Sequence, residues 1–231
     1  ITAAAIRTWV RNPVWRSTRS VIQNLAETHP ESFRVHWAYA SSLEEAGRRE
    51  DSLDFFKRAA ELVPGHYALL RDYGRALYRL QHWGEAAEVF EQAVRSIPEH
   101  RLTHLYLVNS LLRAGRPENA VGAIENALER FPEDAELLDQ AAHAYAAIGA
   151  WELALYAREE NLRIRGDDLR WSEWLHLAMI QAHLGNVEAA HGALLSASNI
   201  APPSITLPTL TELTGGVAAL AQEPQLEHSS T

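Results

Sequence analysis

The sequence contains no cysteine among its 231 residues. Disulfide bonds, thiolate nucleophiles and cysteine-ligated metal sites are therefore excluded. The absence of cysteine is compatible with either an oxidising or a reducing compartment. The location of the protein must be inferred from other features.

Long apolar runs are absent as well. No window approaches the roughly 18 continuous apolar residues that span a bilayer. The chain begins with Ile1 rather than Met and lacks the apolar segment of a signal peptide. We therefore expect the sequence to be a fragment or a processed product.

Acidic residues are missing from the first 26 positions, which carry four arginines. The whole chain has a formal net charge of -9, and no Lys or Arg occurs from Trp171 onward. A nucleic-acid-binding protein needs a broad basic face, so this distribution argues against a nucleic-acid partner. An acidic body with a basic beginning fits a protein that is anchored at one end.

Motifs for catalysis and phosphate binding are also absent, since there is no P-loop, no G-x-S-x-G and no H-E-x-x-H. The segment TGGVAAL lacks the preceding strand of a phosphate-binding turn, and we interpret Gly215 and Gly216 as a turn or kink beside a final helix. We predict no catalytic residue, no metal site and no cofactor.

Four side chains come closest to a metal-binding pattern. Glu188 and His191 are three positions apart on one expected helix, and His176 and His183 belong to the preceding helix. A di-iron bundle needs two Glu-x-x-His pairs, and one is present. We interpret these histidines as polar positions on helix surfaces and turns.

A period of 34 residues organises the chain. One series at this spacing is Pro30, Pro64, Pro98, Pro132 and Gly166. A second series is Gly47, Gln81, Gly115 and Gly149. Two apolar series keep the same register: Phe56, Phe90 and Ile124, and Ala59, Ala93 and Ala127. Each period therefore indicates two antiparallel helices, with the Gly series in the turn between them and Pro just after the second helix.

This register resembles the tetratricopeptide-repeat (TPR) family. The family pattern of Gly or Ala, A-x3-F, Ala and Pro corresponds here to Gly74, Ala86, Phe90, Ala93 and Pro98. The resemblance implies an all-α, right-handed TPR superhelix, an α-solenoid of about five full repeats. We place these repeats at 33-66, 67-100, 101-134, 135-168 and 171-204.

The two ends of the chain complete this arrangement. Residues 1-32 are expected to form a degenerate leading helix pair, which Pro13 begins and Pro30 ends. Residues 205-231 are expected to contain a capping helix, at about 207-221, and a flexible acidic tail. His66 and His100 end successive repeats at one position, which indicates a turn preference.

The fourth repeat departs from the family pattern because Arg158 occupies its large apolar position and Asn161 its Ala position. An unpaired buried charge is very costly, so Arg158 must either extend to water or find a carboxylate. We predict a looser or re-angled joint between the fourth and fifth repeats.

The resemblance also implies a binding surface, because the first helix of each TPR pair lines a concave groove. By register this face carries Ser41, Glu44 and Leu105 together with the predicted binding residues Trp37, Arg71, Arg75, Tyr78, Arg79, Asn109 and Arg113. The middle of the groove is therefore basic and aromatic, which suits an extended peptide or a carboxylate. The alternative is that the arginines pair with Asp72, Glu85 or Glu88 and form a solvated face.

The segment RTWVRNPVWRST at residues 7-18 resembles the R-N-x-x-W stretch that follows the last membrane helix of TPR-containing, O-mannosyltransferase-like membrane proteins. The residues that match are Arg11, Asn12 and Trp15. The resemblance implies that a membrane span precedes Ile1. Lipid headgroups or a membrane protein would then meet Arg7, Trp9, Arg11, Trp15 and Arg16.

An alternative for the same segment is that Trp9, Val10 and Trp15 pack on the following helix. The four arginines favour the cytoplasmic side by the positive-inside rule, whereas the family resemblance favours the outer side. We expect a non-enzymatic scaffold that binds polypeptide, in the periplasmic part of a bacterial membrane protein. The alternatives are a stand-alone subunit docked on a membrane complex and a soluble cytoplasmic adaptor.

Overall fold

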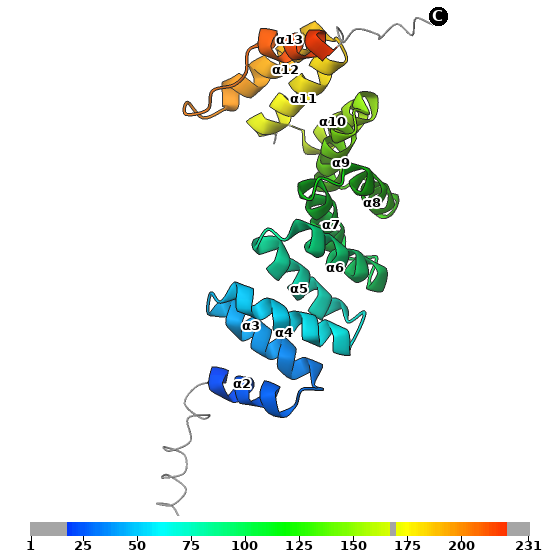
Figure 1. The fold of residues 1–231 in the computed structure, drawn as a ribbon. Helices are drawn as coiled ribbons and strands as arrows, with labels where there is room; N and C mark the ends of the chain where they lie inside the picture. Colours follow the sequence, from blue (N-terminus) through cyan, green and yellow to red (C-terminus); the bar gives the residue numbers. More distant parts are fainter. Residues whose placement is uncertain (1–17, 167–169, 221–231) are drawn as a thin grey trace, which may run out of the picture. The chain divides into compact units, whose positions relative to one another are not determined.

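The computed structural model describes residues 18–166 and 170–220, and every regular element in these ranges is an α-helix (Figure 1). The all-α prediction is therefore confirmed for the described residues. The chain divides into two compact units, Ile1–Arg116 and Pro117–Thr231, which are described separately. The division falls at the turn within the predicted third repeat, where no sequence pattern indicates a boundary.

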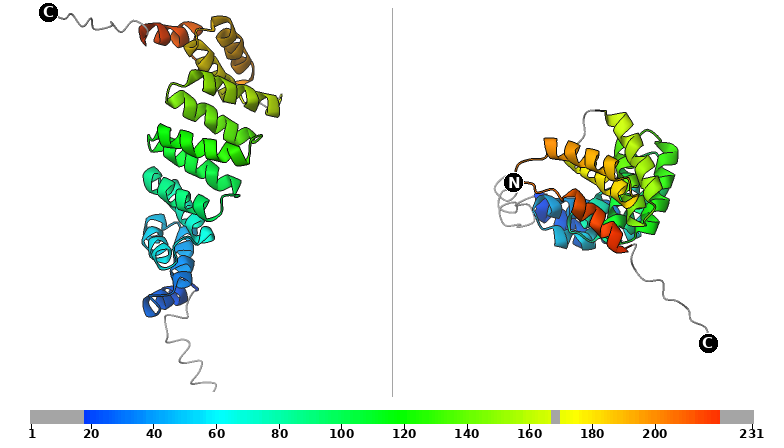
Figure 2. Two further views of the ribbon diagram at one scale, coloured as in Figure 1. Left: turned by 90° about the vertical axis from the view of Figure 1, so that its right-hand side faces the viewer. Right: turned by 90° about the horizontal axis from the view of Figure 1, so that it is seen from above.

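The first unit consists of successive antiparallel helices. Their bounds are α2 (Thr18–Thr28), α3 (Phe33–Glu45), α4 (Arg49–Leu62), α5 (Tyr67–Arg79), α6 (Trp83–Ser96) and α7 (Arg101–Arg113). Helix α3 lies beside α4, and α5 lies beside α6 (Figures 1 and 2). Ile22 of α2 packs on a core formed by Tyr39 and Leu43, so α2 covers the first complete pair.

The second unit has the same helical construction. Its helices are α8 (Pro117–Arg130), α9 (Ala135–Ala147), α10 (Trp151–Arg165), α11 (Trp171–His183), α12 (Val187–Ile200) and α13 (Leu210–Leu220). Helix α13 contacts both α11 and α12, and its Leu213 packs on a core of Leu177, Ala178 and Ala193. It therefore caps the last helix pair, as predicted.

Helix α13 runs through Gly215 and Gly216, so these glycines do not form the predicted turn. Glycine lowers helix propensity by about 1 kcal/mol per residue. Packing of an apolar helix face supplies most helical stability in proteins, and Leu213 provides such a contact here.

The turns inside the helix pairs have left-handed backbone. Gly47, Gly115 and Gly149 have φ angles of 77°, 68° and 75°. Gln81, which stands in the same series, has a φ of 65° and is the one non-glycine residue with positive φ in the described part of the chain. The Gly series therefore marks the turns, and Gln81 adopts a conformation that costs an L-residue about 1–2 kcal/mol.

The two apolar series form the core between paired helices. Phe56 is 2% exposed, and the side chains of Phe90 and Ile124 are fully buried, as are the three small residues Ala59, Ala93 and Ala127. At Gly74, an added Cβ would lie 2.7 Å from Cε1 of Phe90. Glycine at this position therefore allows α5 to approach the Phe90 ring on α6.

Candidate functional site

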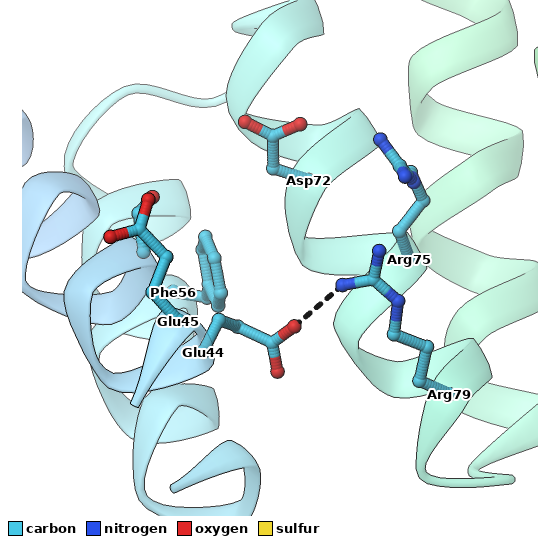
Figure 3. Close-up of a pocket in the computed structure, with 7 residues that line it drawn as sticks. Glu44, Glu45, Phe56, Asp72, Arg75 and Arg79 are labelled. Atoms are coloured by element: carbon cyan, nitrogen blue, oxygen red, sulfur yellow. Dashed lines mark hydrogen bonds and ion pairs between the residues drawn. The ribbon is translucent and has the colours of Figure 1, made fainter. Parts of the chain in front are cut away.

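A pocket opens between the first helices of two successive pairs, α3 and α5 (Figure 3). Its volume is about 170 Å³, and its lining residues are Ser41, Glu44, Glu45, Phe56, Asp72, Arg75 and Arg79. The pocket lies on the face that the repeat register predicts for ligand binding. We call it the α3–α5 pocket.

Two predicted groove residues at one end of this face are held by Asp72. Trp37 Nε1–H donates to Asp72 Oδ2 at 3.2 Å and thereby joins α3 to α5. Arg71 donates through Nε and Nη2 to Asp72 Oδ1 at 3.0 and 2.9 Å. The pairing of Arg71 with Asp72 is the one that the alternative, solvated-face interpretation predicts.

Arg79 is paired across the same two helices. Its Nη1 donates to Glu44 Oε2 at 2.7 Å, and the Glu44 side chain is only 12% exposed. The other carboxylate oxygen, Glu44 Oε1, is buried and has no hydrogen-bond partner within the described residues. Glu85 and Glu88, two carboxylates that the solvated-face interpretation offered to the groove arginines, lie beside His82 and Arg116 instead.

The next contact joins α5 to α7 through Asn109. Tyr78 Oη donates to Asn109 Oδ1 at 2.8 Å, and Arg113 Nε donates to the same oxygen at 2.9 Å. The Arg113 guanidinium also lies 5.0 Å from the centroid of the Trp83 ring, within the range of a cation–π interaction. These three predicted residues therefore form a tie between helices, and their polar groups already have partners.

Arg75 differs from its neighbours on this face. Its side chain is half-buried on the α5 wall of the pocket (Figure 3). Among the described residues, no acceptor forms a hydrogen bond or an ion pair with its guanidinium. An arginine carries five N–H donors in a planar fork, so Arg75 presents unused donors to the pocket.

The pocket carries charged groups of both signs. The sequence indicates a basic groove, but the pocket is lined by the three carboxylates of Glu44, Glu45 and Asp72 and by the two guanidiniums of Arg75 and Arg79. The acids come from the last turn of α3 and from the residue that follows Arg71. Asp72 is 35 positions after Trp37, so its contact across two repeats leaves no local signal in the sequence.

A second polar cluster lies within the second unit, around Arg158. This side chain is fully buried, and its Nη1 donates to Asp139 Oδ1 at 2.7 Å and to Asn161 Oδ1 at 3.2 Å. Of the two predicted outcomes, the carboxylate partner is therefore correct. Asp139 stands 34 residues after Leu105 on the predicted groove face, a signal that could have identified it.

Helix α11 closes this cluster through His176. Arg158 Nη2 donates to His176 Nδ1 at 2.7 Å, and the His176 ring stacks on His143 with 4.1 Å between the ring centroids. Burial, followed by the nearby His143 and Arg158, lowers the pKa of His176 to about 3. His176 is therefore a half-buried helix position whose ring takes part in this network, and not a freely solvated surface position.

The contact between α10 and α11 is less extensive than that between α6 and α7. This difference agrees with the predicted looser joint between the fourth and fifth repeats. A buried guanidinium with three polar partners occupies a position where the family pattern has an apolar side chain.

The remaining histidines of the turns have structural roles. His66 and His100 are the N-cap residues of α5 and α7, as the turn preference predicts, and His66 Nδ1 accepts from the backbone N–H of Leu69 at 3.3 Å. Within the part of the chain that the structure describes, no three His or acidic side chains are placed to hold a metal ion.

The five residues predicted for docking all belong to the N-terminal segment. Arg7, Trp9, Arg11, Trp15 and Arg16 lie outside the described residues. Among the helices of the described ranges, none combines the length and apolar character needed to cross a membrane.

Comparison with curated proteins gives a local similarity to a transferase. Protein O-mannosyl-transferase TMTC1 of Homo sapiens is 29% identical over 68 residues, which make up 29% of this chain and 8% of the transferase. The Mus musculus protein has the same identity over the same length, which is 7% of its chain. The chain thus spans less than a tenth of the length of these curated relatives.

Comparison with solved structures identifies the fold. YrrB, a TPR protein with an unusual peptide-binding site, matches with a TM-score of 0.65 and 22% identity over 79% of this chain and 93% of its own. MamA from Desulfovibrio magneticus RS-1 matches with a TM-score of 0.64 and 17% identity, over 75% of this chain and 97% of its own. Identities this low show a shared fold alone.

The family comparison covers most of the helix pairs. Four overlapping segments, residues 16–67, 56–101, 71–135 and 105–160, match the tetratricopeptide repeat. The fold of this family supports a role as a protein–protein interaction scaffold, and such scaffolds are generally non-enzymatic. Because these matches extend over more than half of its length and the helices follow the same period, the chain belongs to the tetratricopeptide-repeat family.

Proposed function

We propose that this scaffold binds a polypeptide segment along the first-helix face of its first unit, with the α3–α5 pocket as the central contact. The observation that supports this proposal is that the donors of Arg75 are unused. Its neighbours Arg71 and Arg79 are paired with Asp72 and Glu44, whereas the Arg75 guanidinium has no partner among the described residues. A half-buried guanidinium with unused N–H groups can donate hydrogen bonds to carbonyl or carboxylate oxygens.

The surroundings of Arg75 suit a polypeptide. Phe56 gives the pocket an apolar contribution, and Ser41 adds a hydroxyl group. The flanking ties, Trp37 with Asp72 and Tyr78 with Asn109, hold aromatic side chains in fixed positions. Rigid aromatic groups give contact area at low entropic cost. Trp37 and Tyr78 would therefore supply fixed contact surfaces on either side of the pocket. YrrB, which has the same fold, is itself a peptide-binding protein.

Charge reversal tests this function with a matched control. The variant Arg75→Glu places a negative charge on the pocket wall, whereas Arg58→Glu makes the same change on α4 at an exposed residue that pairs with Glu61. We expect Arg75→Glu to weaken binding of peptides from a random, terminally blocked library by at least about tenfold, and Arg58→Glu to leave it unchanged. Both variants should keep the native unfolding temperature. Equal affinity for all three proteins would disprove a role for the pocket.

The wider context that we propose is a membrane. The local similarity to protein O-mannosyl-transferase TMTC1 and the R-N-x-x-W segment support a repeat region that belongs to a larger membrane protein, and the setting that we propose for it is the periplasmic side of a bacterial membrane. In this context the repeats position a polypeptide, and any glycosyl transfer belongs to another part of the protein. Residues Arg7, Trp9, Arg11, Trp15 and Arg16 would contact lipid headgroups or a membrane protein complex.

Removal of residues 1–19 separates this proposal from its alternatives. We expect the shortened chain to lose its association with membranes while its helical circular-dichroism signal remains. Membrane association that persists would place the docking surface on the repeats, as for a stand-alone subunit of a membrane complex. A full chain that never associates with membranes would favour a cytoplasmic adaptor.

A further inference from the structure

Some polar groups of the α3–α5 pocket have hydrogen-bond partners and others have none among the described residues. On the α3 wall, Glu44 Oε2 accepts from Arg79, but Glu44 Oε1 has no donor within the described residues. Glu45 is exposed on the same wall and is likewise without a partner there. On the α5 wall, Arg75 has donors without acceptors (Figure 3). Because Glu44 Oε1 is buried, the exposed acceptor of the α3 wall is the Glu45 carboxylate, and the α5 wall carries the donors of Arg75.

We infer that this pocket binds a carboxamide side chain, that of Gln or Asn, in the bound polypeptide, an assignment that rests on the peptide-binding function proposed above. The carboxamide oxygen accepts from the Arg75 guanidinium. The carboxamide NH2 group donates to the carboxylate of Glu45. This exposed side chain points away from α5 in the structure (Figure 3) and turns towards the pocket to accept the bond. One neutral group thus satisfies both walls.

Charge counting disfavours a carboxylate in the same place. Arg79 neutralises Glu44, and Arg71 neutralises Asp72, so the charges that remain are those of Arg75 and Glu45. A bound carboxylate satisfies Arg75 but adds a second negative charge near Glu45, and it has no hydrogen to donate. A bound ammonium satisfies Glu45 but faces the Arg75 cation. The neutral carboxamide avoids both repulsions.

The size of the pocket agrees with one side chain as its occupant. Its volume of about 170 Å³ is too small for a helix or a folded element. The buried ring of Phe56 at its lining can contact the methylene groups of Gln, which would leave the terminal amide for the charged walls. The polypeptide backbone then lies outside the pocket, along the first-helix face.

Fixed-position peptide libraries test this assignment. The probes are blocked hexapeptide mixtures in which one central position is Gln, Glu, Lys or Ala and the other positions are random. Fluorescence anisotropy with the full chain measures an apparent Kd for each mixture. We expect the Gln mixture to bind about tenfold or more tightly than the other three, and Arg75→Ala to remove this preference.

A variant that lacks the α3 carboxylates gives a second, independent test. The double variant Glu44→Gln/Glu45→Gln replaces two acceptor groups with amides and releases Arg79 from its carboxylate. Its preference should shift from Gln to Glu by at least about tenfold. The control variant Glu61→Gln removes an exposed carboxylate from α4 and should keep the Gln preference. Circular-dichroism melting verifies that each variant is folded.

The outcomes separate this inference from the proposed function. Binding that depends on Arg75 but favours the Glu mixture, or is indifferent to the fixed residue, would overturn the carboxamide assignment and leave peptide binding intact. A Gln preference that survives Arg75→Ala would place the selective site elsewhere and would also overturn it. No binding of any mixture would overturn both the assignment and the peptide-binding function.

Discussion

Arg158 Nη1 donates to Asp139 Oδ1 at 2.7 Å, and this ion pair joins α10 to α9 with the arginine side chain fully buried. Removing one partner of a buried pair leaves an uncompensated charge, which costs about 3–5 kcal/mol. We expect Asp139→Ala to lower the free energy of unfolding by an amount of this order, measured by urea denaturation.

The double variant Asp139→Ala/Arg158→Met provides the control. Methionine restores an apolar side chain at the large apolar position of the repeat pattern and removes the unpaired charge. We therefore expect the double variant to be more stable than Asp139→Ala alone. If the loss of unfolding free energy in the double variant equals the sum of the losses in Asp139→Ala and Arg158→Met, the two residues are not energetically coupled.

The pH dependence of stability reports on His176. Its folded-state pKa of about 3 is far below that of an unfolded histidine, because burial disfavours the charged form. At pH values between the folded-state pKa and the unfolded-state pKa, the unfolded chain binds more protons than the folded one. The free energy of unfolding therefore falls as the pH falls through this range, and it is constant above the unfolded-state pKa. For this residue alone we expect a loss of about 2 kcal/mol between pH 7 and pH 5.

The variant His176→Asn isolates this contribution, since its side-chain oxygen can replace Nδ1 as the acceptor for Arg158. Asp139 and His143, the titratable groups that face the ring, remain in place in this variant. Urea unfolding at the two pH values should show a smaller loss for the variant than for the native chain. An identical loss in both proteins would assign the pH dependence to other groups.

Gln81 occupies a turn where the other members of its series are glycine. Its φ of 65° lies in the left-handed region, where glycine has no steric penalty. We expect Gln81→Gly to raise the free energy of unfolding by about 1 kcal/mol. The control is Gln81→Ala, which keeps the Cβ atom and should bring no gain. A Gly variant that is no more stable than the native chain would show that the Gln81 side chain compensates for its backbone.

Gly74 is required by the ring of Phe90. A Cβ atom at this position would lie 2.7 Å from the ring, and overpacking of this kind costs about 1–3 kcal/mol. This cost exceeds the gain of up to about 1 kcal/mol in helix propensity on replacing Gly by Ala. We therefore expect Gly74→Ala to lower the thermal unfolding temperature. The matched variant Gly122→Ala, where no atom lies within 4 Å of the added Cβ, should raise it or leave it unchanged.

The sequence period predicts the helices well because it reflects backbone geometry. Gly47 and Gly115 mark turns through their φ angles, and Phe90 marks the buried face through its volume. These properties belong to single residues and their neighbours in one helix pair. The break between the two units after Arg116 has no such local cause, and the period continues unchanged across it.

Which groove residues have hydrogen-bond partners could not be predicted in the same way. Arg71 and Arg75 are one helical turn apart on the same face, and nothing in their spacing distinguishes them. Arg71 is paired because Asp72 turns towards it and also accepts from Trp37, 35 residues earlier. Arg75 has no partner among the described residues, since Asp72 pairs with Arg71 and Glu44 pairs with Arg79. Such pairings depend on how successive repeats stack, and a single sequence does not report this.

The most direct test of the account is to observe the Arg75 guanidinium while a peptide binds. Nitrogen-15 spectra of the arginine Nε–H groups can follow each arginine, and Arg75→Lys assigns the Arg75 signal by its loss. Addition of a library-selected peptide should shift the Arg75 signal strongly, while the paired Arg71 and Arg79 change little. A peptide that binds without moving the Arg75 signal, or that moves only signals outside α3 and α5, would contradict the central claim.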